Sequence, residues 1–273
     1  MTDPVELGPD SSEYPAGLHD LEDPPSLWLL GALREAPGVA VVGTRRCTRY
    51  GLGLAEAFGA AIARAGWTTV SGLARGVDTA AHRGALARSG HAVAVLGSGI
   101  DVCYPRENLG LYQRIVEGGG AVLSEYPPGT PPDRWRFPAR NRIIAALSAA
   151  VVVVEAAVTG GALITARLAA EMGRPVFAVP GDVDRDMSEG CNRLIRDGAH
   201  PVLGAEDLVE EMSLVVGPPA DTVPPSHGIP PHGVPVGDLP ELWSLTLTET
   251  LVKLGRLEAA GEVRRLGDHV LPA

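Results

Sequence analysis

The sequence predicts an α/β fold: a Rossmann-like, doubly wound, mostly parallel sheet, with a small winged-helix-like C-terminal domain after a Pro-rich linker. Two observations support this prediction. Short β-branched runs alternate with alanine-rich stretches between residues 39 and 197, which is typical of a parallel sheet covered by helices. Several of these runs are apolar throughout, as expected of strands that are buried on both faces.

Six of the apolar runs are predicted to be strands. They span residues 39–43, 68–72, 92–97, 121–126, 150–156 and 176–180. The stretches that follow them are predicted to be helices, at residues 51–65, 78–88, 107–117, 141–147, 163–171 and 189–197. Because parallel strands end at the same edge of a sheet, the turns after these strands should gather there, where such sheets bind ligands.

The chain is predicted to contain four segments. Residues 1–33 form an acidic N-terminal extension, and residues 34–215 form the Rossmann-like domain. Residues 216–240 form the linker, because this stretch contains eight prolines. Residues 241–273 form the C-terminal domain, in which a helical stretch precedes a Gly-Asp hairpin signal.

The charge is distributed unevenly along the chain. The net charge of −10 is awkward for a nucleic-acid-binding protein, because phosphate contacts need cations. Residues 34–142, however, contain fourteen Arg, eight acidic residues and no Lys, whereas both flanks are acidic. A basic block between acidic flanks favours a directional anion-binding surface, to which Arg brings a planar fork. A genomic preference for Arg codons explains the absence of Lys equally well.

The composition indicates a globular protein of the cytoplasm. Hydrophobic residues make up 45% of the chain and charged residues 21%, which is ordinary. No apolar run near a strand is long enough to span a bilayer, and the first residues lack the pattern of a signal peptide. The three cysteines are scattered and lack metal-binding spacing, as expected in a reducing compartment. We therefore expect no membrane association.

Glycine-rich turns after the predicted strands are candidates for a phosphate-binding rim. Glycine lets backbone amides approach an anion closely, and helix N-termini add a favourable dipole. The turns after the first, second and fifth strands contribute Gly43, Thr44, Arg45, Arg46, Gly72, Leu73, Ala74, Arg75, Gly76, Gly160 and Gly161 to the candidate site. Such turns are also common without any ligand, so glycines alone leave both possibilities open.

Residues 134–142 (RWRFPARNR) interleave four Arg with Trp135 and Phe137. Stacking of bases on aromatic rings, together with Arg–phosphate contacts, is a common way of holding single strands. The alternative is that the two aromatic side chains fill the core while the arginines are solvated. The candidate site also includes Phe137, Arg140, Asn141 and Arg142.

The motifs of several enzyme classes are absent. The first turn lacks GxGxxG, and neither GxxxxGK[ST] nor GxSxG occurs. Asp78 and His82 lie four residues apart on a predicted helix, where a stabilising or packing pair is commoner than an acid–base pair. Asp182, Asp184 and Asp186 alternate but lack the rest of an EF-hand pattern. We predict no catalytic residue, no metal site and no cofactor.

Several longer motifs occur together and in a characteristic order. They are VAVVGTRRCTRYG, SGLARGVDTAAHRGAL, VAVLGSGIDVCYPREN, GGAVLSEYPPGTPPDRWRFPARNRIIAALS and GGALITARLAAEMGRPVFAVPGDVD. Over residues 38–210 the chain resembles the DprA (Smf) family of DNA-processing proteins. The segment TLTETLVKLGRLEAAGEVRRLGDHVL is similar to the winged-helix-like domain at the C-terminus of many members.

The resemblance implies a single-stranded-DNA-binding protein of natural transformation. Such a protein protects incoming DNA, helps to load the RecA recombinase, acts as a homodimer and has no established enzymatic activity. The resemblance also implies phosphate contacts from Arg45, Arg140, Asn141 and Arg142, with residues 72–76 on the same rim.

The chain departs from the family pattern at two places. Many relatives carry a basic residue and a Ser-Gly-Ser turn where this chain has residues 159–162, so a cation and two hydroxyl donors are missing. The segment before residue 38 is also shorter than the helical N-terminal domain of many members.

The main alternative is a Rossmann-type nucleotide-processing enzyme that resembles the phosphoribohydrolases. Those enzymes carry PGGxGTxxE after a strand. The nearest match here, TGGALITAR, lacks both the Gly-Thr pair and the Glu. The sequence therefore favours a binding protein over an enzyme.

Overall fold

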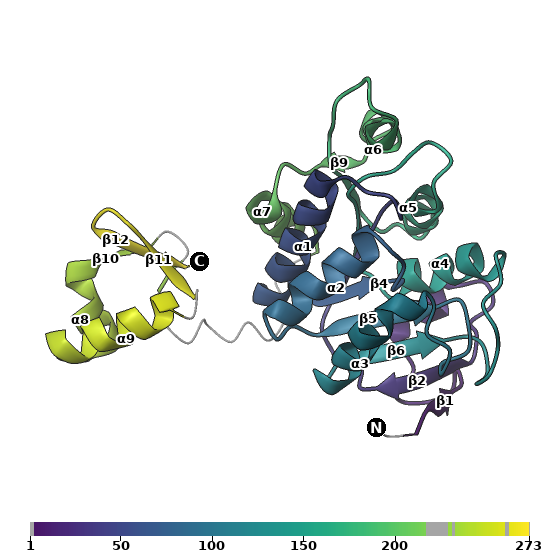
Figure 1. The fold of residues 1–273 in the computed structure, drawn as a ribbon, viewed down its shortest axis with the longest axis horizontal. Coiled ribbons are helices and arrows are strands. Elements are labelled where there is room, and N and C mark those ends of the chain that lie inside the picture. The colour runs from purple at the N-terminus through teal and green to yellow at the C-terminus, as the bar shows by residue number, and fades with distance from the viewer. Residues whose placement is uncertain (1–2, 217–228, 231–232, 260–261, 273) are drawn as a thin grey trace. The chain divides into compact units, whose positions relative to one another are not determined.

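The computed structural model describes residues 3–216, 229–230, 233–259 and 262–272. The chain divides into two compact units, residues 1–221 and residues 222–273, which are described separately below. Figure 1 labels the helices and strands of both units.

The first unit is built on a nine-stranded sheet with the order β1-β2-β6-β5-β4-β3-β7-β8-β9. Strands β3 to β9 run parallel to one another, whereas β1 and β2 are antiparallel to their neighbours. From β3 the chain proceeds outward through β4, β5 and β6, and then returns to place β7 on the other side of β3. The predicted Rossmann-like fold class is confirmed, and its topological switch point lies between β3 and β7. The strands are β1 (Val5–Leu7), β2 (Leu27–Gly31), β3 (Gly38–Val42), β4 (Thr68–Ser71), β5 (Ala92–Leu96), β6 (Ala121–Ser124), β7 (Ala150–Val153), β8 (Val176–Ala178) and β9 (His200–Pro201).

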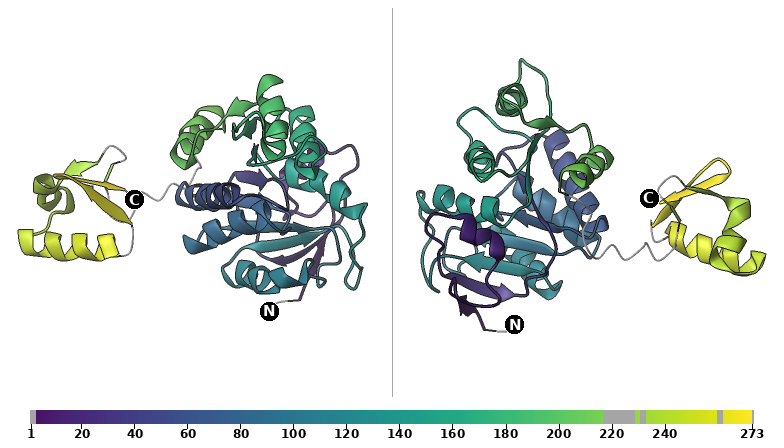
Figure 2. Two further views of the ribbon diagram at one scale, coloured as in Figure 1. Left: turned by 45° about the horizontal axis from the view of Figure 1, so that its top comes forward. Right: turned by 180° about the vertical axis from the view of Figure 1, so that it is seen from behind.

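Helices cover both faces of this sheet, as Figure 2 shows. Val39 and Val41 of β3 pack in a cluster with Phe58 of α1, whereas Val42 packs in a cluster with Ile143 of α4. This alternation along one strand gives each helical layer its own hydrophobic core. One layer contains α1 (Arg49–Arg64), α2 (Val77–Ala87), η2 (Arg106–Asn108), α3 (Leu109–Glu117) and α7 (Ala205–Val216); the other contains η1 (Ala16–Asp20), α4 (Arg136–Ala146), α5 (Gly161–Glu171) and α6 (Asp186–Arg196).

All six predicted strands and all six predicted helices are observed, with bounds shifted by a few residues. The largest shift is at α4, which begins at Arg136 rather than at the predicted residue 141. Pro138 lies in the first turn of this helix, where a backbone amide has no intrahelical acceptor, so the proline does not interrupt it. Helix α7 and the strands β1, β2 and β9 were not predicted.

Residues 1–33, predicted as an acidic N-terminal extension, contribute two strands to the sheet. Strand β2 pairs with β6, with Trp28 opposite Ser124 and Gly31 opposite Ala121, and β1 adds a further strand beyond it. Leu27 is fully buried. The segment therefore completes one edge of the sheet, and the predicted boundary at residue 34 is too late.

In its described residues, the second unit contains two α-helices, a short 3-10 helix and a three-stranded sheet with the order β10-β12-β11. Its small core includes Leu239, Leu254 and Val270. Of the predicted linker, residues 217–228 and 231–232 lie outside the described residues, whereas residues 234–240 belong to folded elements. The predicted helix-then-hairpin order is observed, and the likeness to a winged helix stays a prediction. The elements are β10 (Val234–Pro235), η3 (Val236–Asp238), α8 (Leu239–Trp243), α9 (Leu247–Ala259), β11 (Val263–Leu266) and β12 (His269–Pro272).

Throughout the described part of the chain, no helix has both the length and the apolar character that crossing a bilayer requires.

Candidate nucleic-acid interface

A pocket of about 570 Å³ opens at the topological switch point. It lies beyond the carboxyl ends of β3 and β7, and residues of α4 and α5 complete its wall. This is the position at which open parallel sheets bind ligands, and the volume is typical of ligand pockets. The pocket brings together ten of the predicted site residues: Gly43, Thr44, Arg45, Arg46, Ala74, Phe137, Arg140, Asn141, Gly160 and Gly161.

The rim of this pocket carries an excess of positive charge. Arg45, Arg46 and Arg134 are exposed, and none forms an ion pair with a described residue. Asp78 is the one acidic side chain among the described residues that line the pocket. The guanidinium of Arg45 lies 5.0 Å from the ring centroid of Phe137, which fixes it by a cation–π contact. The rim therefore presents arginines that are free to bind an anion.

The N-cap residue of α1, Thr48, accepts a hydrogen bond from Gly51 N and is itself held by a carboxylate of the protein. Glu155, just after β7, accepts hydrogen bonds from Thr48 N at 2.8 Å and from Thr48 Oγ1 at 2.6 Å. A side chain at Gly51 would place its Cβ 2.4 Å from this carboxylate, so the first turn of α1 needs glycine there. The position at which a dinucleotide-binding fold receives its pyrophosphate is thus already filled.

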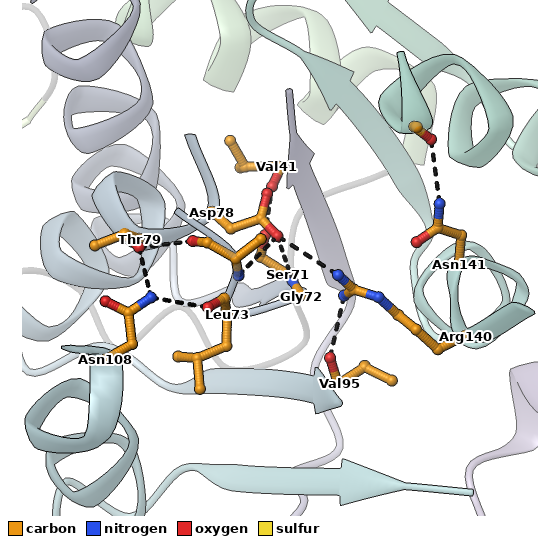
Figure 3. Close-up of polar contacts among 12 residues, drawn as sticks. Val41, Ser71, Gly72, Leu73, Asp78, Thr79, Val95, Asn108, Arg140 and Asn141 are labelled. Carbon is orange, nitrogen blue, oxygen red and sulfur yellow. Dashed lines mark hydrogen bonds and ion pairs between the residues drawn. The ribbon is translucent and has the colours of Figure 1, made fainter. Parts of the chain in front are cut away.

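The predicted glycine-rich loop at residues 72–76 is closed in the same way. Asp78 Oδ2, in the first turn of α2, accepts hydrogen bonds from Gly72 N at 3.1 Å and from Ala74 N at 3.2 Å, as Figure 3 shows. The prediction that these amides face a bound phosphate therefore needs correction. They serve an internal carboxylate instead, because Asp78 reaches them from within the same loop–helix junction.

Further hydrogen bonds fix the same loop from the other side. Asn108 Nδ2 donates to Leu73 O at 2.8 Å and to Thr79 Oγ1 at 2.9 Å, and Thr79 Oγ1 donates to Ala74 O at 2.6 Å. Leu73 is fully buried and has a positive φ of 55°. Leu73 is consequently a packing residue that shapes the loop, and it does not line the pocket.

Arg140 forms the base of the pocket rather than its rim. Its side chain is 5% exposed, Nη1 donates to Val95 O at 3.1 Å, and Nη2 lies 3.9 Å from Asp78 Oδ2 (Figure 3). Burial lowers the pKa of Arg140 to about 10, against the opposing effect of Asp78, so it stays charged at neutral pH. Burial also raises the pKa of Asp78, while Arg140 opposes that rise. The predicted phosphate contact of Arg140 stays a prediction, and the structure places its charge at the base of the pocket beside Asp78.

The backbone of Gly72 lies directly against this guanidinium. A Cβ at residue 72 would come within 1.5 Å of Arg140 Nη1. The close approach of Arg140 accounts for the glycine at this position.

Five predicted residues do not line the pocket: besides Gly72 and Leu73, these are Arg75, Gly76 and Arg142. Arg75 is held by Glu107, with Nε–Oε1 and Nη2–Oε2 distances of 2.5 and 2.7 Å, and lines a separate hollow together with Gly76. Arg142 forms an ion pair with Glu125. Successive helical residues point in different directions, so the helix that turns Asn141 toward the pocket directs Arg142 elsewhere.

The N-terminus of α5, in contrast, is open. Gly160 is its N-cap residue and supplies no side-chain cap, and Gly160, Gly161 and Ala162 all line the pocket. Asn141 Nδ2 donates to Gly161 O at 3.1 Å, which holds this turn against α4. First-turn amides without a cap are suited to binding an anion. The turn at residues 159–162, which lacks the hydroxyl donors of many relatives, therefore retains its backbone amides as donors.

Sequence reasoning missed several residues of this site. Arg134 was within the basic stretch but was not selected, and Tyr104, whose ring centroid lies 5.4 Å from that of Phe137, ends the turn after the third predicted strand. Position at the same sheet edge was the signal that could have found both. Within the described residues, no cluster of three His, Cys, Asp or Glu side chains could hold a metal ion.

Comparison with known proteins identifies the family. Residues 7–213 match the family described as DNA recombination-mediator protein A. The chain belongs to this family, DprA. The resemblance drawn from the motifs is thereby confirmed.

Relatives support the assignment. The chain is 43% identical to the Smf protein of Synechocystis over 219 residues, which cover 78% of this chain and 55% of that protein. It is 43% identical to DprA of Streptococcus pneumoniae over 201 residues, which cover 72% of this chain and 71% of that protein. The match thus spans about half the length of the Synechocystis relative.

Solved structures agree with the fold. The X-ray structure of Streptococcus pneumoniae DprA has a TM-score of 0.71 at 42% identity and covers 76% of this chain and 74% of that one. A structure of Helicobacter pylori DprA, concerned with its single-stranded DNA binding mode, has a TM-score of 0.69 at 30% identity. The match covers 77% of this chain and 95% of that one.

Proposed function

We propose that this protein binds single-stranded DNA in the pocket between β3 and β7, protects it and helps to load the RecA recombinase. In this proposal it acts as a homodimer in the cytoplasm and catalyses no reaction. Family membership supports the proposal, as does the single-stranded DNA binding of the Helicobacter pylori relative.

The observation that carries the proposal is the pairing of two anion-binding features in one pocket. The uncapped N-terminus of α5 supplies backbone donors, and Arg45 supplies an exposed cation held on Phe137. A backbone phosphate can be bound by both groups together. A nucleotide-processing enzyme gains no comparable support, because Asp78, the acidic group of the pocket, is engaged by Gly72 N and Ala74 N.

The proposal is tested by fluorescence anisotropy of a labelled oligonucleotide, single-stranded and duplex, at several salt concentrations. We expect the single strand to bind preferentially and its affinity to fall with salt. Arg45→Ala should weaken binding to all sequences and reduce the slope of log affinity against log salt by about 0.7, the value of one single-strand phosphate contact.

Arg193→Ala is the control, because it removes another exposed arginine, which is paired with Glu189 on α6 and does not line the pocket. It should leave affinity and salt slope unchanged. A wild-type protein that ignores DNA at low salt, or an Arg45→Ala variant with the wild-type slope, would overturn the proposal.

A further inference from the structure

Trp135 is an exposed aromatic side chain beside the pocket. It immediately precedes α4, and 57% of its surface is exposed. Arg134 directly before it and Phe137 two residues after it both line the pocket, so the backbone of Trp135 lies at the pocket wall. An exposed indole in this place needs an explanation, because the sequence left open whether the aromatics of this stretch fill the core.

The indole is held in one orientation by three neighbours. Trp135 Nε1 donates to Asp133 Oδ2 at 2.9 Å, and the guanidinium of Arg136 lies 5.1 Å from the ring centroid. Tyr126 meets it edge-on, with 6.1 Å between the ring centroids and an interplanar angle of 90°. Arg136 is itself fixed by Pro131 O. A binding partner would therefore lose little conformational entropy in ordering this surface.

Phe137 provides a contrast within the same stretch. Its ring has the guanidinium of Arg45 at 5.0 Å and the ring of Tyr104 at 5.4 Å, so it is engaged in contacts within the protein. Trp135 instead keeps more than half of its surface open to solvent. Trp135 is therefore the more exposed of the two aromatic side chains of this stretch.

The charges around Trp135 are mixed, and their balance favours an anionic partner. The acids are Asp133, which is engaged by Trp135 Nε1, and Glu125, which is paired with Arg142. Arg134 has no ion-pair partner among the described residues, and the guanidinium of Arg136 lies over the rings of Tyr126 and Trp135. A partner with a flat aromatic face and a negative backbone fits this combination.

We propose that Trp135 forms a second subsite, outside the pocket, on which one unpaired base stacks while a neighbouring phosphate occupies the pocket. This inference rests on the proposed function. The occupant is a single strand, because duplex bases have no free faces to offer.

The test compares Trp135→Ala and Trp135→Phe with the wild type on two oligonucleotides of equal length. One carries all its bases, and the other is abasic throughout and keeps only sugar and phosphate. For the complete strand, Trp135→Ala should lose about tenfold in affinity, with an unchanged salt slope, and Trp135→Phe should recover most of it. For the abasic strand, the three proteins should bind equally.

The outcomes separate the two proposals. If the wild type binds single strands and Trp135→Ala binds them equally well, the subsite is refuted and the function of the pocket stands. If Trp135→Ala weakens binding to both strands alike, the indole has a structural role and the subsite is again refuted. If the wild type binds no single strand, both proposals fail.

Discussion

Three helix N-termini meet the same edge of the sheet, and they are used in two ways. Beside those of α1 and α2, internal carboxylates accept backbone hydrogen bonds: Glu155 from Thr48 N, and Asp78 from Gly72 N and Ala74 N in the loop that precedes α2. That of α5 begins at Gly160 without any side-chain cap. Among the described residues, the N-terminus of α5 is the one of these three with no carboxylate hydrogen-bonded to the backbone beside it, which leaves it available to an external anion.

The largest effect expected from disturbing this arrangement comes from Asp78→Asn. The amide oxygen can still accept from Gly72 N and Ala74 N, but the buried guanidinium of Arg140 loses its counter-charge. We expect the free energy of unfolding to fall by about 3 kcal/mol in urea denaturation at pH 7.

Asp182→Asn is the control for this variant, since Asp182 forms an exposed ion pair with Arg185. It should change stability by no more than about 0.5 kcal/mol. Equal stability of Asp78→Asn and the wild type would show that the closed loop does not depend on the charge of Asp78.

A smaller, pH-dependent effect should appear at His82, which lies four residues after Asp78 on α2 and is fully buried with neither ring nitrogen hydrogen-bonded to a described residue. Burial, and then Arg140, lower its pKa from 6.5 to about 3. The unfolded chain therefore takes up a proton that the folded chain refuses, so this histidine costs stability as the pH falls below 6.5. Each pH unit costs roughly 1.4 kcal/mol.

His82→Leu should remove this pH-dependent loss of stability. Between pH 7 and pH 5 the wild type should lose about 2 kcal/mol more of its unfolding free energy than the variant does, measured by urea denaturation at both pH values. Asp78 is present in both proteins, so its own titration cancels in the comparison. Parallel pH profiles would show that His82 is protonated in the folded state.

The smallest effect is expected from a substitution that gives α5 a carboxylate at its N-terminus, as the N-termini of α1 and α2 have beside them. Gly161→Asp places a carboxylate at the open N-terminus of α5, where a new Cβ would meet nothing within 4 Å. Single-strand affinity should fall about tenfold, equivalent to about 1.4 kcal/mol, while the helix is slightly stabilised.

Gly161→Asn is the uncharged match and should bind nearly as the wild type does in the same anisotropy assay. A Gly161→Asp variant with undiminished affinity would place the phosphate elsewhere in the pocket.

The parallel core of the fold could be predicted from the sequence, because each central strand is a short apolar run with a turn after it. The outer strands on either side of this core could not. β1 has three residues and β9 two, and β2 has no alternation that would distinguish it from any apolar patch. Pairing of β2 with β6 joins residues far apart in the chain, which local patterns do not reveal.

The candidate site, too, could be predicted only in part. The pocket residues of the first turn and α4 follow from the rule that strands end at one edge. Whether the amides of a turn bind a ligand or a side chain of the protein does not follow from this rule. Glu155 lies 107 residues from Thr48, and no local sequence pattern predicts the hydrogen bonds between them. Local motifs therefore identified glycines correctly as special while leaving open whether a ligand or a side chain occupies the space beside them.

The order of strands in the sheet also sets the order in which the protein can be assembled on the ribosome. β2 ends at Gly31, but its partner β6 begins only at Ala121. Until that later segment has been synthesised, the β1–β2 ribbon has an unpaired edge that other chains could join. The central pair β3–β7 likewise waits for residue 153. Such long-range pairing slows folding, so rapid synthesis at high temperature should favour aggregation of nascent chains over maturation.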